Sequence, residues 1–291
     1  MVNQTAAKPS PGLYLVATPI GAARDITLRA LDLLRGADVI AAEDTRSLRK
    51  LLDIHGISLD GRPLVAYHDH SKSAVRARLL QDISAGKSVV YASEAGTPMV
   101  ADPGYDLARD VIAADLPLVS ALGPSAVVTA LTLSGLPTDR FFFVGFLPNA
   151  SGKRKSALRE VAAVPGTLVF YESPKRVGAM LRDAAEVLGA SRRAVVCREL
   201  TKKFEEVLRG TLQELSDACA ERPLKGEVVV LVDRGNLPSI DEIDLDSVLI
   251  DTLREKSVRD TADEVAANLG LKRRQVYQRA LQLTKDGMDE T

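Results

Sequence analysis

Residues 89–98 have the sequence VVYASEAGTP, in which an apolar run, 89–92, leads directly into a polar turn, 93–98. A short apolar run flanked by charge or glycine is typical of a buried strand. Open α/β sheets place ligands outside the carboxyl ends of their strands, where such turns lie. This stretch therefore predicts a strand of an α/β fold with a binding loop at its carboxyl end.

The same junction occurs twice more along the chain. The apolar run 13–17 leads into Thr18-Pro19-Ile20-Gly21, and the run 39–42 leads into Glu43-Asp44-Thr45-Arg46. Glycine lets a ligand approach the backbone closely, and proline fixes a loop without leaving a free donor. We expect the three turns to form one shared pocket.

Helical patterns lie between the apolar runs. One helix is predicted from Ile26 to Ala37, with Asp25 as its N-cap, and another from Val177 to Leu188. Further strands are predicted at residues 168–171, 194–197 and 228–232. Strands separated by helices of about 10–15 residues favour an α/β architecture with largely parallel sheets.

Breaks in the pattern divide the chain. Leu122-Gly123-Pro124 interrupts it before an apolar helix at 125–133, and a polar segment rich in acids precedes a wholly helical end. In that end, two apolar stripes meet at Gly270, as in a helix-turn-helix. The predicted organisation starts with a disordered lead-in at 1–11, followed by an N-terminal α/β lobe at 12–122 and a C-terminal α/β lobe at 123–235, with a cleft between the two lobes. A linker at 236–246 then leads to a small all-α, helix-turn-helix-like tail at 247–291.

Composition limits the class of protein. Lys+Arg 38 against Asp+Glu 39 gives a formal net charge of -1, so a global cationic field for nucleic acid is absent and any such contact is local. The chain is 46% hydrophobic, which excludes wholesale disorder. Cys197 and Cys219 match no disulfide framework or paired metal spacing. No apolar run approaches the roughly 20 residues of a membrane span. We expect a soluble cytoplasmic protein without a membrane partner.

The pair His68 and His70 leaves three interpretations open. Residues i and i+2 of an extended segment point the same way, so the imidazoles could contact a substrate, bind a metal or end a strand. A catalytic zinc needs three protein ligands, which weakens the metal interpretation. We predict no metal.

Ten short runs occur in order along the chain: TPIG with DIT (18–27), AAEDTR (41–46), YHDH (67–70), SEAGTP with DPGY (93–105), GPSA (123–126), GLPTDRF (135–141), GFLP (145–148), FYESPKR (170–176), RELTKKFEE (198–206) and KGE (225–227). With these runs the sequence resembles the tetrapyrrole-methylase superfamily and, within it, the ribosomal small-subunit (16S) RNA cytidine-2′-O-methyltransferase I family. The similarity covers residues 12 to about 235 and includes the helical tail.

The resemblance implies S-adenosylmethionine bound in the cleft, commonly within a homodimer. Its motifs place the cofactor on Pro19, Ser93, Glu94, Ala95, Gly96, Tyr105, Phe170, Tyr171, Lys225 and Gly226. Two positions depart from the family: Glu94 stands where Asp is usual, and Ala22 where Asn is usual. The tetrapyrrole-modifying branch typically opens with GxGPGD, which TPIGAA lacks, and this favours the RNA branch.

The implied reaction methylates the ribose 2′-hydroxyl of a cytidine in small-subunit ribosomal RNA, and a weakly acidic hydroxyl requires a base. The candidates are Glu43, Asp44, Glu199 and Lys202, the lysine only if burial lowers its pKa. A salt bridge to Arg46 or Arg198 is the alternative role for each acid. We hypothesise that Asp44 or Glu199 faces the methyl group.

RNA contact is expected from local basic clusters, with ribosomal RNA as partner. Naked RNA and an assembled subunit both remain open as the substrate, and the resemblance implies the assembled small subunit. The candidates are Arg46, His68, His70, Lys153, Arg154, Lys155, Lys175, Arg176, Lys203, Lys272, Arg273 and Arg274. Aromatic residues make up only 4% of the chain, so broad base stacking is not expected.

Two other functions remain open from the sequence. One is a methyltransferase of the same fold that acts on a tetrapyrrole or a protein side chain. The other is a ligand-sensing helix-turn-helix regulator, although the tail has few residues beyond its leading basic ones to read bases.

Overall fold

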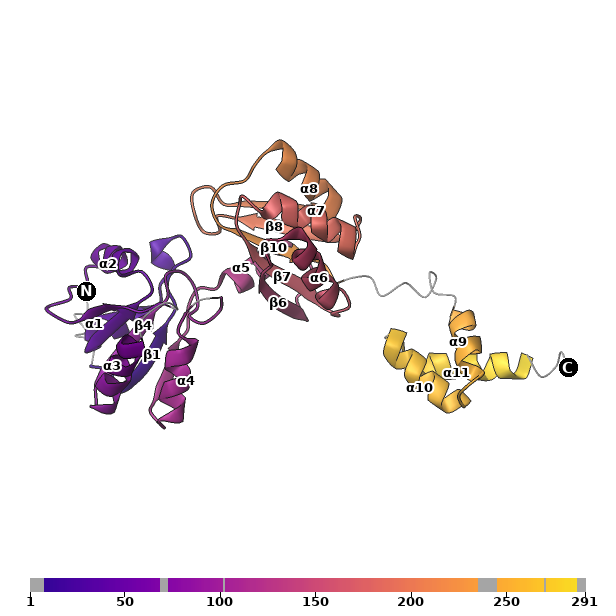
Figure 1. Cartoon of the computed structure of the whole chain (residues 1–291), viewed down its shortest axis with the longest axis horizontal. Helices are drawn as coiled ribbons and strands as arrows, with labels where there is room; N and C mark the ends of the chain where they lie inside the picture. Colours follow the sequence, from indigo (N-terminus) through magenta and orange to yellow (C-terminus); the bar gives the residue numbers. More distant parts are fainter. Residues whose placement is uncertain (1–7, 69–72, 102, 235–244, 270, 287–291) are drawn as a thin grey trace. The chain divides into compact units, whose positions relative to one another are not determined.

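The computed structural model describes residues 8–68, 73–101, 103–234, 245–269 and 271–286. The chain forms two compact units that divide after Arg234 (Figure 1). Most of the predicted lead-in and most of the predicted linker lie outside the described residues. Within the described residues, no helix is long and apolar enough to cross a membrane.

The first sheet of the larger unit is entirely parallel. Its strands are β1 (Gly12–Val16), β2 (Val39–Ala42), β3 (Leu64–Ala66), β4 (Ser88–Ala92) and β5 (Leu118–Ala121), in the order β3-β2-β4-β1-β5. Helices α1 (Leu28–Gly36) and α2 (Thr45–Ile54) pack on one face, and α3 (Ser73–Ser84) and α4 (Tyr105–Ala113) on the other. Two covered faces explain why its central strands are apolar apart from Ser88 at the start of β4. We call this sheet with its helices the N-terminal lobe.

The second sheet is mixed, so the expectation of largely parallel sheets is wrong for this part of the chain. Its strands are β6 (Phe141–Phe146), β7 (Thr167–Glu172), β8 (Arg193–Arg198), β9 (Glu206–Thr211) and β10 (Val228–Val232), in the order β6-β7-β10-β8-β9. Only β6 and β7 pair in parallel; the other three pairs are antiparallel. Residues 199–205, between β8 and β9, are too few for a parallel crossover.

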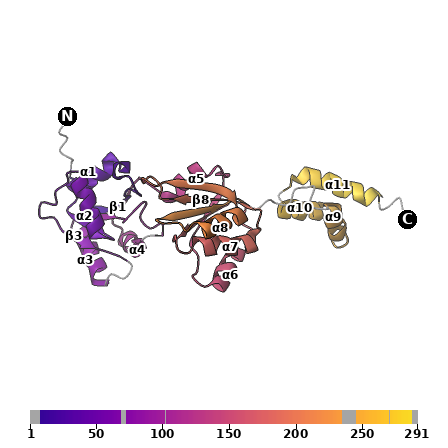
Figure 2. The ribbon, with the colours of Figure 1, turned by 90° about the horizontal axis from the view of Figure 1, so that it is seen from above.

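The second sheet is also covered on both faces. Figure 2 shows α5 (Ala126–Ser134) on one side, and α6 (Ser151–Val161), α7 (Val177–Leu188) and α8 (Leu212–Glu221) on the other. Because successive strand residues point to opposite faces, Phe170 packs under α6–α8 while its neighbour Tyr171 lies on the α5 face. We call this sheet with its helices the C-terminal lobe.

Most predicted elements in the larger unit are present, with local corrections. The six predicted strands match β1, β2, β4, β7, β8 and β10, and the helix at 177–188 is confirmed, whereas β3, β5, β6 and β9 were missed. Asp25 is not the N-cap of the first helix. It ends a 3-10 turn, and Thr27 caps α1 by accepting a hydrogen bond from Ala30 N at 3.1 Å.

The smaller unit is helical, as predicted. It contains α9 (Leu245–Leu253), α10 (Val258–Leu269) and α11 (Arg273–Asp286). The predicted apolar stripes meet in a core of their own, where Ala262, Val276 and Ala280 are fully or almost fully buried. Gly270, the predicted joint between two helices, lies outside the described residues.

Candidate active site

A cavity of about 640 Å³ lies within the larger unit and is lined by both lobes. The N-terminal lobe contributes the segments that follow β1, β2 and β4, and the C-terminal lobe contributes the ends of β6, β7 and β8 and the turn before β10. The volume is within the usual range for a small-molecule site. The three turns predicted to form one pocket therefore do line a common cavity.

The wall from the N-terminal lobe is held by hydrogen bonds between two of these turns. Thr18 and Gly96 exchange backbone hydrogen bonds of 3.0 and 2.9 Å. The hydroxyl of Ser93 donates to the Gly96 carbonyl at 2.5 Å, and that of Thr18 donates to the Ser93 carbonyl at 3.1 Å. Gly96 has a φ of 81°, which favours glycine. Ser93 is thus a buried support of the loop and does not itself line the cavity.

The wall from the C-terminal lobe is organised by Glu199. Its Oε1 accepts from the backbone N–H of Glu227 at 2.9 Å and from the Lys202 ammonium at 3.0 Å. A Cβ on Gly226 would lie 2.2 Å from the same oxygen, and the φ of 87° at this position also favours glycine. Glu199 therefore joins the turn after β8 to the turn before β10.

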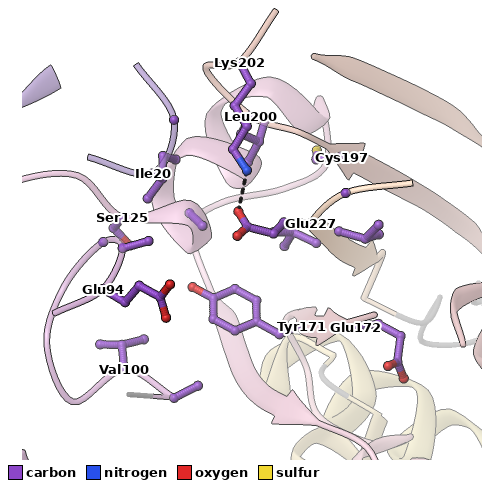
Figure 3. A pocket seen from close by; sticks show the side chains of 18 of the residues that line it. Ile20, Glu94, Val100, Ser125, Tyr171, Glu172, Cys197, Leu200, Lys202 and Glu227 are labelled. Carbon is purple, nitrogen blue, oxygen red and sulfur yellow. Dashed lines mark hydrogen bonds and ion pairs between the residues drawn. The ribbon is translucent and has the colours of Figure 1, made fainter. Parts of the chain in front are cut away.

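Carboxylates from both lobes give the cavity a negative character. Glu43 and Glu94 line it from the N-terminal lobe and Glu227 from the C-terminal lobe. The pKa of Glu94 is raised by partial burial and by the negative charges of Glu43, Asp44 and Glu227. Figure 3 shows the Glu94 carboxylate and the hydroxyl end of Tyr171 pointing toward one another. A bound cation would relieve this repulsion among like charges.

The candidate bases separate into two that line the cavity and two that do not. Glu43 and Lys202 line it. Burial acts against the charge of Lys202, yet hydrogen bonds to Glu227 (2.9 Å, Figure 3) and Glu199 raise its pKa overall. The condition under which Lys202 could act as a base, a pKa lowered by burial, is not met.

Asp44 and Glu199 are not among the residues that line the cavity. Asp44 caps α2 by accepting from Arg46 N at 2.8 Å, and its pair with the Arg46 side chain lowers its pKa. The pKa of Glu199 is lowered mainly by the Glu227 backbone hydrogen bond. The salt-bridge alternative therefore describes Asp44 in this structure, and the hypothesis that either acid faces the methyl group gains no support.

Six of the ten predicted cofactor residues line the cavity, namely Pro19, Glu94, Ala95, Gly96, Tyr171 and Gly226. Phe170 is a wrong assignment because its side chain is fully buried in the core on the opposite face of β7. Tyr105 is 64% exposed and lines a separate, smaller cavity with His68. Lys225 is exposed, and the structure places its neighbours Gly226 and Glu227 on the wall instead.

Several wall residues that lie in the quoted runs were not predicted as site residues, and two of them, Glu227 and Phe146, matter most for the site. Glu227 ends KGE, and Phe146 is the aromatic residue of GFLP. The run KGE shows that Glu227 is charged and follows a glycine turn. Its ion-pair partner Lys202, however, lies 25 residues away in sequence, so the pair could not be predicted. No spacing rule connects two residues so far apart.

The predicted RNA contacts differ widely in exposure. Arg154 is a wrong assignment, because its side chain is 6% exposed and its Nε lies 2.7 Å from Asp183 Oδ2. Lys155 pairs with Glu186, Arg176 with Glu172, and Arg273 with Asp263. His70 lies outside the described residues. The exposed candidates are Arg46, His68, Lys153, Lys175 and Lys203 in the larger unit, and Lys272, Arg273 and Arg274 in the smaller one.

Comparison with known families identifies the class. The family Tetrapyrrole (Corrin/Porphyrin) Methylases matches residues 12–216, and the RsmI C-terminal HTH domain matches residues 239–284. Among solved structures, a uroporphyrin-III C-methyltransferase from Thermus thermophilus complexed with S-adenosyl homocysteine is similar, with a TM-score of 0.55 and 22% identity over 76% of this chain and 97% of that one. Diphthine synthase is similar with a TM-score of 0.58 and 16% identity over 76% and 89%. The fold is that of the tetrapyrrole methylases.

Closer relatives narrow the assignment. A protein of Mesorhizobium japonicum named ribosomal RNA small subunit methyltransferase I is 45% identical over 288 residues, covering 97% of both chains. A protein of the same name from Mycobacterium bovis is 42% identical over 276 residues, covering 94% of this chain and 96% of its own. The chain belongs to the ribosomal RNA small subunit methyltransferase I family.

Proposed function

We propose that this protein transfers a methyl group from S-adenosylmethionine to the ribose 2′-hydroxyl of a cytidine in small-subunit ribosomal RNA. The observation that carries the proposal is one cavity, lined by both lobes and rich in carboxylates, in a chain whose relatives are named for methylation of that RNA. The 2′-hydroxyl of cytidine as the acceptor rests on the motif resemblance described above.

The wall chemistry fits the cofactor. S-adenosylmethionine supplies a methyl group on a positively charged sulfur. Glu43, Glu94 and Glu227 offer negative charge to such a cation, and Ile20, Val100 and Leu200 offer apolar surface to the rest of it. Partial burial, together with the negative charges of Glu43, Asp44 and Glu227, raises the pKa of Glu94, and a bound cation would favour its ionised form. We assign the sulfonium region to Glu94 on this ground.

Proton removal falls to Glu43. Of the four candidate bases, only Glu43 and Lys202 line the cavity, and Lys202 is held as an ammonium by two carboxylates. A base positioned at the hydroxyl contributes typically about 10²–10⁴-fold to rate. Lys202 instead keeps Glu227 and Glu199 in place, and its positive charge limits the negative potential of that wall.

RNA contact is assigned to the exposed cations of the larger unit, which include Lys153, Lys175 and Lys203, and to Lys272 and Arg274 of the helical unit. We also expect a cytoplasmic enzyme that acts on the assembled small subunit as a homodimer. Light scattering coupled to gel filtration tests the dimer, since a mass near 31.2 kDa would exclude it.

The activity is tested by incubating the protein with small ribosomal subunits and methyl-deuterated S-adenosylmethionine, followed by mass spectrometry of the nucleosides. The expected product is 2′-O-methylcytidine that carries the label. Label on a nucleobase or on no nucleoside would contradict the proposal. Parallel reactions with a porphyrinoid and with ribosomal proteins test the two alternative acceptors.

A further inference from the structure

Phe146 is an exposed aromatic residue at the wall of the cavity. It ends β6, the edge strand of the second sheet, and 58% of it is exposed. It lines the cavity together with Tyr171. A large apolar ring left open to solvent beside a binding cavity is a candidate contact for a ligand that arrives from outside.

A β-bulge directs this ring toward the cavity. The register of β6 on β7 shifts between Phe143 and Gly145, and Phe146 then pairs with Tyr171. Gly145 has a φ of 78°, whereas a Cβ placed on it would meet no heavy atom of the described residues within 4 Å. The glycine is therefore needed for backbone conformation and not for space. Bulges beside active sites commonly re-aim a side chain in this way.

The neighbouring rings support Phe146 from one side. Its ring centroid lies 5.7 Å from that of Tyr171 at an interplanar angle of 64°, and Tyr171 in turn lies 4.9 Å from Phe143 at 70°. These are edge-to-face contacts, which stabilise ring positions. Because Phe146 remains more than half exposed, such contacts leave ring surface available for stacking.

The backbone that follows Phe146 is joined by a hydrogen bond to a turn that carries two basic residues. Arg176 donates from Nη2 to the carbonyl of Leu147, the residue after Phe146, at 2.6 Å. The turn that carries Arg176 also carries the exposed Lys175, and its residues Ser173 and Pro174 line the cavity. An exposed aromatic ring at the cavity wall, on a strand joined to a turn with an exposed lysine, offers the two kinds of group that bind an unstacked base and its phosphate in single-stranded RNA.

We propose that Phe146 stacks on the nucleobase of the nucleotide that is methylated. The proposal rests on the proposed function and names the residue that holds the acceptor. A single stacked base agrees with the small number of aromatic residues in the chain, since one platform suffices to hold one extruded nucleotide. The adenine of the cofactor is the competing occupant, and the test separates the two.

The chain contains no tryptophan, so Phe146→Trp introduces one fluorescent reporter. Cytidine monophosphate is expected to quench its emission, whereas ribose 5-phosphate, which lacks the base, and S-adenosylmethionine are not. The matched control is Phe142→Trp, on the same strand, 45% exposed and away from the cavity wall. Quenching by S-adenosylmethionine, equal quenching in the control, or no response to the nucleotide would each overturn the proposal.

A second measurement uses the reaction. Phe146→Ala should raise KM for small ribosomal subunits by about 5- to 150-fold, the effect of losing one base–aromatic stack, with cofactor affinity within twofold of wild type. Phe146→Tyr should retain most of the wild-type KM, and Phe142→Ala should leave it unchanged. A fall in cofactor affinity in Phe146→Ala would overturn the proposal. Absence of methyl transfer by the wild type would instead contradict the proposed function, while the fluorescence test would still decide the role of the ring.

Discussion

The hydroxyl of Thr201 accepts a hydrogen bond from the backbone N–H of Ala22 at 3.0 Å and so joins the two lobes beside the cavity. Thr201 has a φ of 62°, which is unusual for a β-branched residue and costs conformational energy. A Cβ on Gly21 would lie 2.5 Å from the same hydroxyl oxygen, so the loop after β1 approaches this turn very closely. The contact fixes the distance between Gly21 on one wall and Lys202 on the other.

Thr201→Val removes the hydroxyl acceptor but keeps the shape of the side chain. Amide hydrogen exchange in residues 19–22 should become about 3- to 10-fold faster, and affinity for S-adenosylmethionine should fall by a similar factor, as expected for one lost hydrogen bond. Thr201→Ser should restore both. Thr132→Val, on the exposed side of α5, is the control. Equal loss in the Val and Ser variants would show that the hydroxyl does not act as this link.

Glu43→Gln should lower kcat at saturating cofactor by about 10²–10⁴-fold, because it removes the assigned base and keeps the size of the side chain. Asp44→Asn is the comparison, since Asp44 caps α2 and does not line the cavity. Steady-state methyl transfer to small subunits measures both. If Asp44→Asn lost the rate and Glu43→Gln kept it, the assignment of the base would be reversed.

Glu94 has a raised pKa in the folded chain, so ionisation of this carboxyl disfavours folding. Its stabilising contribution is complete below the unfolded value of 4.5 and is lost as pH rises through the higher folded value. Glu94→Gln should therefore raise Tm by about 1–2 °C at pH 7–8, a small effect because the group is exposed, and should give no gain below pH 4.5. Scanning calorimetry at several pH values measures this.

The same variant should bind S-adenosylmethionine about tenfold more weakly at neutral pH, because a charge facing the cofactor is lost. Glu94→Asp retains the charge and should bind more tightly than the Gln variant. If Glu94→Gln and Glu94→Asp bound S-adenosylmethionine with equal affinity, the charge of Glu94 would not contribute to cofactor binding.

Arg154→Ala should lower the free energy of unfolding by about 3–5 kcal/mol, because it removes the buried cation that pairs with the Asp183 carboxylate. Lys153→Ala, at the adjacent exposed position, should leave stability within about 0.5 kcal/mol of wild type. It should instead reduce the salt dependence of RNA binding. Chemical denaturation measures the stability of the two variants, and RNA binding at several salt concentrations measures their phosphate contacts. If Arg154→Ala kept wild-type stability and reduced the salt dependence, Arg154 would be an RNA contact after all.

The sequence predicted local structure well where one strand and its following turn contained the signal. The runs at 13–17, 39–42 and 89–92 and their turns identified the N-terminal wall of the cavity, because each turn follows directly from its strand. Contacts between segments that lie far apart in the sequence could not be predicted from it. The mixed order of the second sheet and the pair of Lys202 with Glu227 depend on tertiary packing.

Two assignments failed because residue type does not specify which way a side chain points. Phe170 and Tyr171 are adjacent aromatics, and strand alternation sends one to the core and the other to the cavity. Lys153, Arg154 and Lys155 form one basic run on α6, yet the helix turns Arg154 inward to Asp183. Phe146 was missed because its orientation depends on a bulge at Gly145.

Titration calorimetry with S-adenosylmethionine tests the central claim, that both lobes form one cofactor site. The wild type should bind one molecule per chain. Ala95→Trp, which narrows the cavity from the N-terminal lobe, and Ser173→Trp, which narrows it from the C-terminal lobe, should each abolish the binding heat while leaving Tm near that of the wild type. No binding by the folded wild type, or full binding in either variant, would contradict the account.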